Sequence, residues 1–258
     1  MRTLQLTVNC WSYWQARPNF ESNLPQNKYL GFYSPQQFII FPNPDRQLLI
    51  TMSLQSIRIP PTTGKPVAVI VALHGWGANA RDLTSLASAF NLPDYQFVFP
   101  DAPFPHPQAA SCKMWYDLQS KDAEGLLESR ELLTEFLLSL ESSTGVPLSR
   151  TILGGFSQGG AMTLDVGLTL PLAGLICLSG YLHSSISPVA GSALPPVLIV
   201  HGTEDTIVPV TAAVRSRDCL TAWGSAVQYR EFNMGHEILP EVVDVMRSFV
   251  LETVSKCD

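Results

Sequence analysis

Cysteine is scarce in this chain of 258 residues. The five cysteines are odd in number, widely separated and without a Cys-x-x-Cys pair. Disulfide frameworks and structural zinc sites need paired or closely spaced cysteines, so the sequence predicts neither a disulfide framework nor a metal site. A reducing cytoplasm is the compartment that fits best. Cys177 lies inside an apolar run and is expected to be a small buried residue.

Basic clusters and long apolar runs are also missing. The net charge is −6 and the charged fraction is 15%, with no grouping of Lys and Arg, so nucleic acid is excluded as a partner. No apolar run reaches about 18 residues, which predicts no integral membrane segment. The N-terminus lacks the apolar stretch of a secretory signal. Hydrophobic residues make up 46% of the chain, enough to build a core.

Residues 1–51 differ from the rest of the chain. They are rich in aromatic residues and prolines and show no clear periodicity. We interpret 1–51 as an N-terminal extension of unknown role. Met52 opens a segment that resembles a natural N-terminus, so we expect the native start there and a single α/β domain over 52–258.

From residue 52 onward, apolar runs of strand length alternate with segments of helical spacing. This alternation predicts βαβ units around a mostly parallel sheet with helices on both faces. Strands are expected at 67–73, 95–99, 150–154, 174–179, 197–201 and 227–232. Helices are expected at 81–90, 122–142, 158–168, 210–223 and 240–255.

The most informative motif is Gly-Phe-Ser-Gln-Gly at 155–159, between an expected strand and an expected helix. This layout is typical of a nucleophile elbow, in which a tight turn projects the serine hydroxyl outward. Flanking glycines allow the two backbones to approach closely. Ser157 is therefore the candidate nucleophile.

A serine nucleophile needs an imidazole to take its proton and a carboxylate to orient the imidazole. The order Ser, acid, His is that of α/β-hydrolases. Glu204 and Asp205 both follow the expected strand 197–201, and we favour Asp205, with Glu204 as a solvated neighbour. His236 follows the last expected strand and is the candidate general base.

The remaining acids and histidines have less specific interpretations. Asp165 and Asp218 fall within expected helices and are interpreted as surface charges or helix-face contacts. His201 ends a strand and is expected to be a buried, hydrogen-bonded imidazole. His106 and His183 lie in expected loops, where either could touch a substrate.

The tetrahedral intermediate of acyl transfer requires N–H donors for its oxyanion. The elbow supplies the backbone N–H of Gln158. The Gly-rich segment Leu-His-Gly-Trp-Gly at 73–77 follows an earlier strand, and the backbone N–H of Trp76 is the candidate second donor.

Six ordered motifs resemble those of the carboxylesterase/phospholipase family of α/β-hydrolases, which includes bacterial carboxylesterases and acyl-protein thioesterases. Besides the segments at 73–77 and 155–160, they are Pro-Asp-Ala-Pro at 100–103, Met-Trp-Tyr-Asp at 114–117, His-Gly-Thr-Glu-Asp at 201–205 and Met-Gly-His-Glu at 234–237. The resemblance covers about residues 55–255 and implies the α/β-hydrolase fold with little or no cap domain. It also implies no cofactor. The family's triad falls on Ser157, Asp205 and His236, and its oxyanion donors fall on Trp76 and Gln158.

The family typically hydrolyses carboxylic esters or thioesters with modest acyl chains. The segment 100–121 is too long for an ordinary connecting turn and is expected to shape an acyl pocket. Candidates for the pocket lining are apolar residues that are equally compatible with a core position: Trp76, Phe104, Met114, Trp115 and Tyr116.

The sequence leaves several alternatives open. An acyltransferase would use the same triad, a non-catalytic ligand receptor could share the fold, and lysophospholipids remain candidate substrates. A homodimer is one alternative for the oligomeric state.

Overall fold

The computed structural model describes residues 53–120, 123–186, 188 and 193–257, and within them seven strands form the central sheet. The expected extension 1–51 and the expected start at Met52 lie outside these residues. The strands are β1 (Ser56–Ile59), β2 (Ala68–Leu73), β3 (Tyr95–Pro100), β6 (Thr151–Phe156), β7 (Gly174–Leu178), β8 (Val197–Gly202) and β9 (Val227–Phe232).

The order across the sheet is β1-β3-β2-β6-β7-β8-β9. β1 runs antiparallel to β3, and every other neighbouring pair in the order is parallel. Parallel strands bring their carboxyl ends to one edge of a sheet, where ligand sites of open α/β sheets lie. The loops after β2, β6, β8 and β9 therefore meet at one edge.

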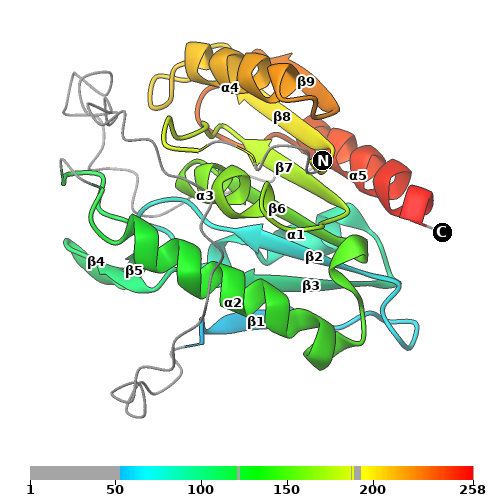
Figure 1. Ribbon diagram of the computed structural model, residues 1–258. Coiled ribbons are helices and arrows are strands. Elements are labelled where there is room, and N and C mark those ends of the chain that lie inside the picture. Colours follow the sequence, from blue (N-terminus) through cyan, green and yellow to red (C-terminus); the bar gives the residue numbers. More distant parts are fainter. Residues whose placement is uncertain (1–52, 121–122, 187, 189–192, 258) are drawn as a thin grey trace, which may run out of the picture.

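Helices cover both faces of the sheet (Figure 1). One face packs against α2 (Leu126–Thr144), α3 (Gln158–Gly167) and α4 (Val210–Ala222). The other face packs against α1 (Ser85–Phe90) and α5 (Pro240–Val254). None of the helices in the described part of the chain is long and apolar enough to cross a membrane.

Strand β2 illustrates how the two cores arise from one apolar run. Val69 and Val71 pack into the core under α2 and α3, whereas Ala68 and Ile70 pack into the core under α1 and α5. Side chains alternate between the faces of a strand, so a strand covered on both faces is apolar throughout. The six strands expected from such runs are all present, and the mostly parallel α/β fold is confirmed.

The structure differs from the sequence prediction at three places. β1 was not predicted. The segment 100–121, expected to be a long loop, contains a two-stranded hairpin of β4 (Phe104–His106) and β5 (Ala109–Met114). The expected helix 81–90 begins as a 3-10 turn, Ala80–Leu83, which the short helix α1 follows.

Candidate active site

Ser157 occupies the sharp turn between β6 and α3. Its φ of 56° and ψ of −118° lie in a region that residues with a side chain rarely adopt. The turn depends on glycine at both flanks. A Cβ on Gly155 would lie 2.3 Å from the Gly159 carbonyl, and a Cβ on Gly159 would lie 2.3 Å from the Leu73 carbonyl oxygen. The backbone thus has the strained strand-to-helix geometry of a nucleophile elbow.

Asp205 and His236 are in contact, in the loops after β8 and β9. His236 Nδ1 lies 2.7 Å from Asp205 Oδ2, and both residues are buried. The other carboxylate oxygen, Oδ1, accepts hydrogen bonds of 2.9 Å from the backbone N–H groups of Ile207 and Val208. Because an ionised carboxylate can only accept hydrogen bonds, Nδ1 carries the proton and Nε2 is the basic nitrogen of His236.

The surroundings of Asp205 favour its ionised form. Burial alone would raise the pKa of Asp205, but the hydrogen bonds from His236, Val208 and Ile207 outweigh burial and lower this pKa below its usual value. His201 also contacts this loop, with Nε2 2.7 Å from the Val208 carbonyl oxygen. Burial lowers the pKa of His201, which is therefore a neutral, fully buried imidazole. The exposed side chain of Glu204 points to solvent instead.

Two observations show that the separate loops lie close together at the elbow. The ring centroids of Phe156, the residue before the serine, and His236 are 4.7 Å apart. A Cβ on Gly75, in the loop after β2, would lie 3.3 Å from Ser157 Cβ. The serine, the imidazole and the Gly-rich loop therefore share one edge of the sheet, as the sequence predicts.

The Gly-rich loop is held by His74 and by β5. His74 Nδ1 donates to the Gly75 carbonyl at 2.8 Å, and His74 Nε2 accepts from the Ala102 N–H at 3.0 Å. Gly77 N–H donates to the Lys113 carbonyl of β5 at 2.9 Å. Burial lowers the pKa of His74, so this imidazole is neutral and uses one nitrogen as donor and the other as acceptor. The backbone around Trp76 is therefore fixed beside the serine.

Gln158 opens α3, so its backbone N–H lies in the first helical turn, where N–H groups have no partner within the helix. Such groups suit a developing negative charge. The Gln158 side chain is buried and makes two hydrogen bonds: Oε1 accepts from Trp115 N–H at 2.9 Å, and Nε2 donates to the Tyr116 carbonyl at 2.7 Å. The sequence motif predicts a role for the Gln158 backbone N–H but gives no sign of these two side-chain hydrogen bonds.

Four of the five lining candidates divide into two pairs. Phe104 and Met114 are opposite each other in the β4–β5 hairpin, and both are partly exposed. Trp115 and Tyr116 are 0% and 1% exposed and belong to the core under α2 and α3. A wholly buried side chain offers no surface to a ligand, so of these four only Phe104 and Met114 are available to line a pocket.

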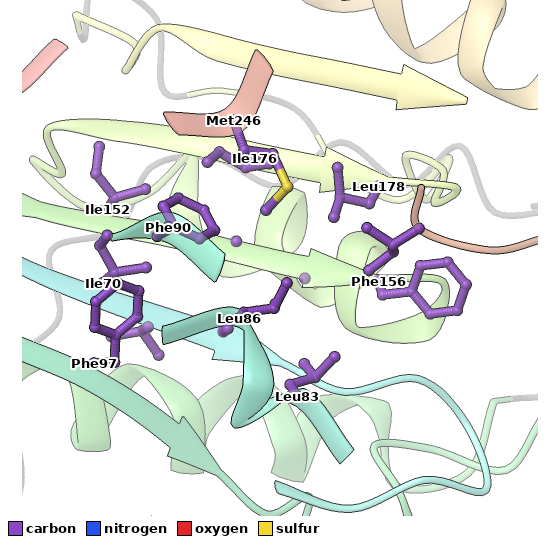
Figure 2. Close-up of a pocket in the computed structure, with 15 residues that line it drawn as sticks. Ile70, Leu83, Leu86, Phe90, Phe97, Ile152, Phe156, Ile176, Leu178 and Met246 are labelled. Atoms are coloured by element: carbon purple, nitrogen blue, oxygen red, sulfur yellow. The ribbon is translucent and has the colours of Figure 1, made fainter. Parts of the chain in front are cut away.

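A small apolar cavity lies on the other face of the sheet, between β2, β6 and the helices α1 and α5 (Figure 2). Ile70, Phe90 and Met246 are among its lining residues, and it extends to Phe156 beside the elbow. Its volume is about 20 Å³, enough for one water-sized molecule. An apolar void of this size is a feature of core packing, and none of the five lining candidates borders it.

A second aspartate–histidine pair joins α3 to the segment that follows β7. His183 Nδ1 is 2.8 Å from Asp165 Oδ2, and both side chains are buried. Of the two interpretations of Asp165, a surface charge is wrong and a helix-face contact is right, because Asp165 on α3 accepts from Arg130 on α2. Asp218, with 61% of its side chain exposed, is a surface charge. The partners of Asp165 are distant in the sequence, so spacing alone could not reveal the pair. His106, which was also expected in a loop, is instead the last residue of β4 and is buried against the Trp76 ring.

A family model described as Phospholipase/Carboxylesterase matches residues 54–254. The chain belongs to this family. Acyl-protein thioesterase 1 of Neurospora crassa is 30% identical over 223 residues, which cover 76% of this chain and 91% of that protein. Acyl-protein thioesterase 1 of Schizosaccharomyces pombe is 35% identical over 178 residues, covering 62% and 78% of the two chains.

Solved structures agree with this membership. The crystal structure of esterase PE8 has a TM-score of 0.71 and 30% identity, with 78% of this chain and 99% of that chain covered. Zea mays acyl-protein thioesterase 2 has a TM-score of 0.65 and 26% identity, with the same coverage. As a member of the phospholipase/carboxylesterase family, the chain is a carboxylic ester hydrolase with an α/β-hydrolase fold. A small-molecule ester or thioester is the substrate class that fits the family.

Proposed function

We propose that this hydrolase cleaves carboxylic esters or thioesters through an acyl-enzyme on Ser157. His236 is the general base and Asp205 orients it. The observation that carries the proposal is the 2.7 Å contact between His236 Nδ1 and Asp205 Oδ2 at the same edge as the strained elbow. Strain at a residue with a side chain costs about 1–3 kcal/mol and persists mainly at functional positions.

The reaction has two steps. In the first, Ser157 Oγ attacks the substrate carbonyl carbon while His236 Nε2 takes the hydroxyl proton, and the leaving alcohol or thiol then receives that proton. In the second, water attacks the acyl-enzyme, His236 takes one water proton, and Ser157 regains a proton as the acid departs. Asp205 remains ionised throughout and stabilises the imidazolium.

The oxyanion of each tetrahedral intermediate would accept hydrogen bonds from the backbone N–H groups of Trp76 and Gln158. Support comes from the loop position next to Ser157 for Trp76 and from the helix N-terminus for Gln158. Removing a single oxyanion donor typically costs about 100–1,000-fold in kcat.

The acyl group would lie against Phe104 and Met114 at the base of the β4–β5 hairpin. Their partial exposure supports this position. Thioesters are included because relatives of this chain are named acyl-protein thioesterases. Lysophospholipids, which are also carboxylic esters, remain candidate substrates.

A panel of p-nitrophenyl esters and acyl thioesters of graded chain length tests the proposal. Ser157→Ala should lower kcat on the best substrate by on the order of 10⁶-fold. Ser142→Ala, at an exposed position of α2, is the matched control and should leave kcat unchanged. A Ser157→Ala variant with near-full activity would show that the mechanism is wrong.

Two further measurements separate the alternatives. Covalent labelling by a fluorophosphonate probe would exclude a non-catalytic ligand receptor. Added alcohols that divert most of the acyl product from water would indicate an acyltransferase. A homodimer and a cytoplasmic location stay predictions, to be tested by sedimentation of the purified chain and by fractionation of cells.

A further inference from the structure

Helix α3 holds residues 115–116 at two points. In its first turn, the Gln158 side chain bonds Trp115 N–H and the Tyr116 carbonyl. Seven residues later on the same helix, Asp165 reaches Tyr116 through His183. Positions seven apart lie on one face of a helix, so both contacts are made from the same side of α3.

The second point of attachment is a chain of buried hydrogen bonds. His183 Nδ1 donates to Asp165 Oδ2 at 2.8 Å, and His183 Nε2 lies 3.1 Å from the Tyr116 hydroxyl. The Tyr116 and Tyr181 hydroxyl oxygens are 2.6 Å apart. Arg130 donates from Nε and Nη2 to Asp165 Oδ2 at 2.9 and 2.7 Å. Burial raises the pKa of both tyrosines, so each keeps its donor proton.

Two members of this chain of hydrogen bonds reach different parts of the active site. Tyr116, in the middle of the chain, belongs to the segment that the Gln158 side chain binds, and the Gln158 backbone N–H is a proposed oxyanion donor. Tyr181, at one end, packs with Ala161 and Val208 in a small apolar cluster. Val208 N–H is one of the two backbone donors to Asp205 Oδ1. The chain therefore connects the oxyanion donor to the loop that holds the acid.

A buried charged network is a weak source of stability, because desolvation offsets much of the attraction between its charges. Well-packed apolar residues of similar volume are often as stabilising or more so. What such a network supplies is a fixed geometry. Here the network fixes the position of residues 115–116. The Trp115 carbonyl also accepts a hydrogen bond from the Ser129 hydroxyl.

We propose that Tyr116, held by His183 and Asp165, is a positioning residue that sets the place of the Gln158 N–H in the oxyanion site. The inference rests on the proposed function. Tyr116 does not touch the substrate: it acts through its own backbone carbonyl and the Gln158 side chain. Loss of the Tyr116 hydroxyl should therefore reduce the stabilisation of the transition state and leave substrate binding in the ground state nearly unchanged.

The test is a double-mutant cycle on the full chain. Tyr116→Phe keeps the ring and removes one hydroxyl, and Gln158→Met removes both side-chain hydrogen bonds at similar size. Active sites are counted by fluorophosphonate titration, so that kcat is measured per labelled serine and misfolded protein is not counted. Tyr229→Phe, which removes a hydroxyl bonded to Glu231 on the edge strand β9, is the matched control.

We expect Tyr116→Phe to lower kcat per labelled serine about 10-fold, with KM changed less than about 2-fold, because small displacements of catalytic groups have effects of this order. Gln158→Met should have at least as large an effect, and the double variant should be no slower than Gln158→Met alone. The control should match wild type.

Two results would overturn the inference: an unchanged kcat per labelled serine in Tyr116→Phe, or effects of the two substitutions that simply multiply. If Tyr116→Phe yields no folded protein, Tyr181→Phe and His183→Gln carry the same prediction with the same readout. Failure of the proposed function looks different, because then the wild-type chain is not labelled or Ser157→Ala stays active.

Discussion

His236 contacts Asp205 through Nδ1 and Oδ2 at 2.7 Å, and His183 contacts Asp165 through the same atoms at 2.8 Å. All four residues are buried. Judged by this contact alone, either pair would serve as the base and acid of a serine hydrolase. The two pairs differ in the groups that surround them.

The carboxylates have different partners. Asp205 is held by neutral backbone N–H groups and by His236, whereas Asp165 also accepts two hydrogen bonds from the Arg130 guanidinium. The imidazoles face different groups as well. His183 Nε2 is occupied by the Tyr116 hydroxyl, while the His236 ring lies beside Phe156 of the elbow. His183 Nε2 already bonds a phenol and cannot take a serine proton. We therefore propose His236, and not His183, as the general base.

Replacing each of the two histidines should give the largest difference in kcat between the two pairs. His236→Gln should lower kcat by on the order of 10⁶-fold, as for loss of the base in other triads. His183→Gln should lower kcat only about 10-fold, because it acts through position. Steady-state kinetics measures both, per labelled serine for His183→Gln and per folded protein for His236→Gln, whose serine would not be labelled without the base. A loss in His183→Gln as large as in His236→Gln would mean that the assigned roles are wrong.

Replacing the two aspartates should affect kcat and stability in different proportions. The main effect of Asp205→Asn should be on kcat, which should fall about 10⁴-fold, because the imidazole adopts the wrong tautomer. The main effect of Asp165→Asn should be on the free energy of unfolding, which should fall by about 3 kcal/mol, the low end for breaking a buried pair, because 26% of the Arg130 side chain is exposed. Urea unfolding and kinetics separate the two effects. Glu204→Gln, in the same loop as Asp205 but exposed, is the control and should change neither quantity.

Acid titration gives the smallest expected effect and sharpens the description of Asp205. Its pKa in the folded state is lowered below the ordinary value of 3.8, so its ionised form stabilises the fold. That stabilisation is fully present above about pH 4 and is lost as the pH falls through the lowered pKa. The difference in unfolding free energy between wild type and Asp205→Asn should therefore shrink below about pH 4. A difference that grows in acid would contradict this.

The sequence predicts well where a short motif determines local geometry. The elbow, the six parallel strands and the neighbouring positions of Asp205 and His236 all follow from apolar runs and from residues placed just after strand ends. Each of these depends on contacts within a few residues or on the rule that parallel strands share an edge.

Prediction fails where the partner is distant or the element is short. Asp165 resembles an exposed helical acid until Arg130 and His183, from other elements, are brought against it. β4 spans only three residues and includes a proline, which hides a strand signal. Trp115 and Tyr116 follow a plausible lining residue in the sequence, yet tertiary packing places both in the core.

The missing side chain of Gly159 has a consequence for redesign. Because α3 touches the carbonyls of Leu73 and His74 directly, the spacing between the two proposed oxyanion donors is a distance between backbones. Substitutions of Phe104 and Met114 at the base of the β4–β5 hairpin leave this backbone contact in place, so the spacing would stay constant while these two residues vary. New substrate ranges could then be selected at the base of the hairpin without rebuilding the catalytic machinery.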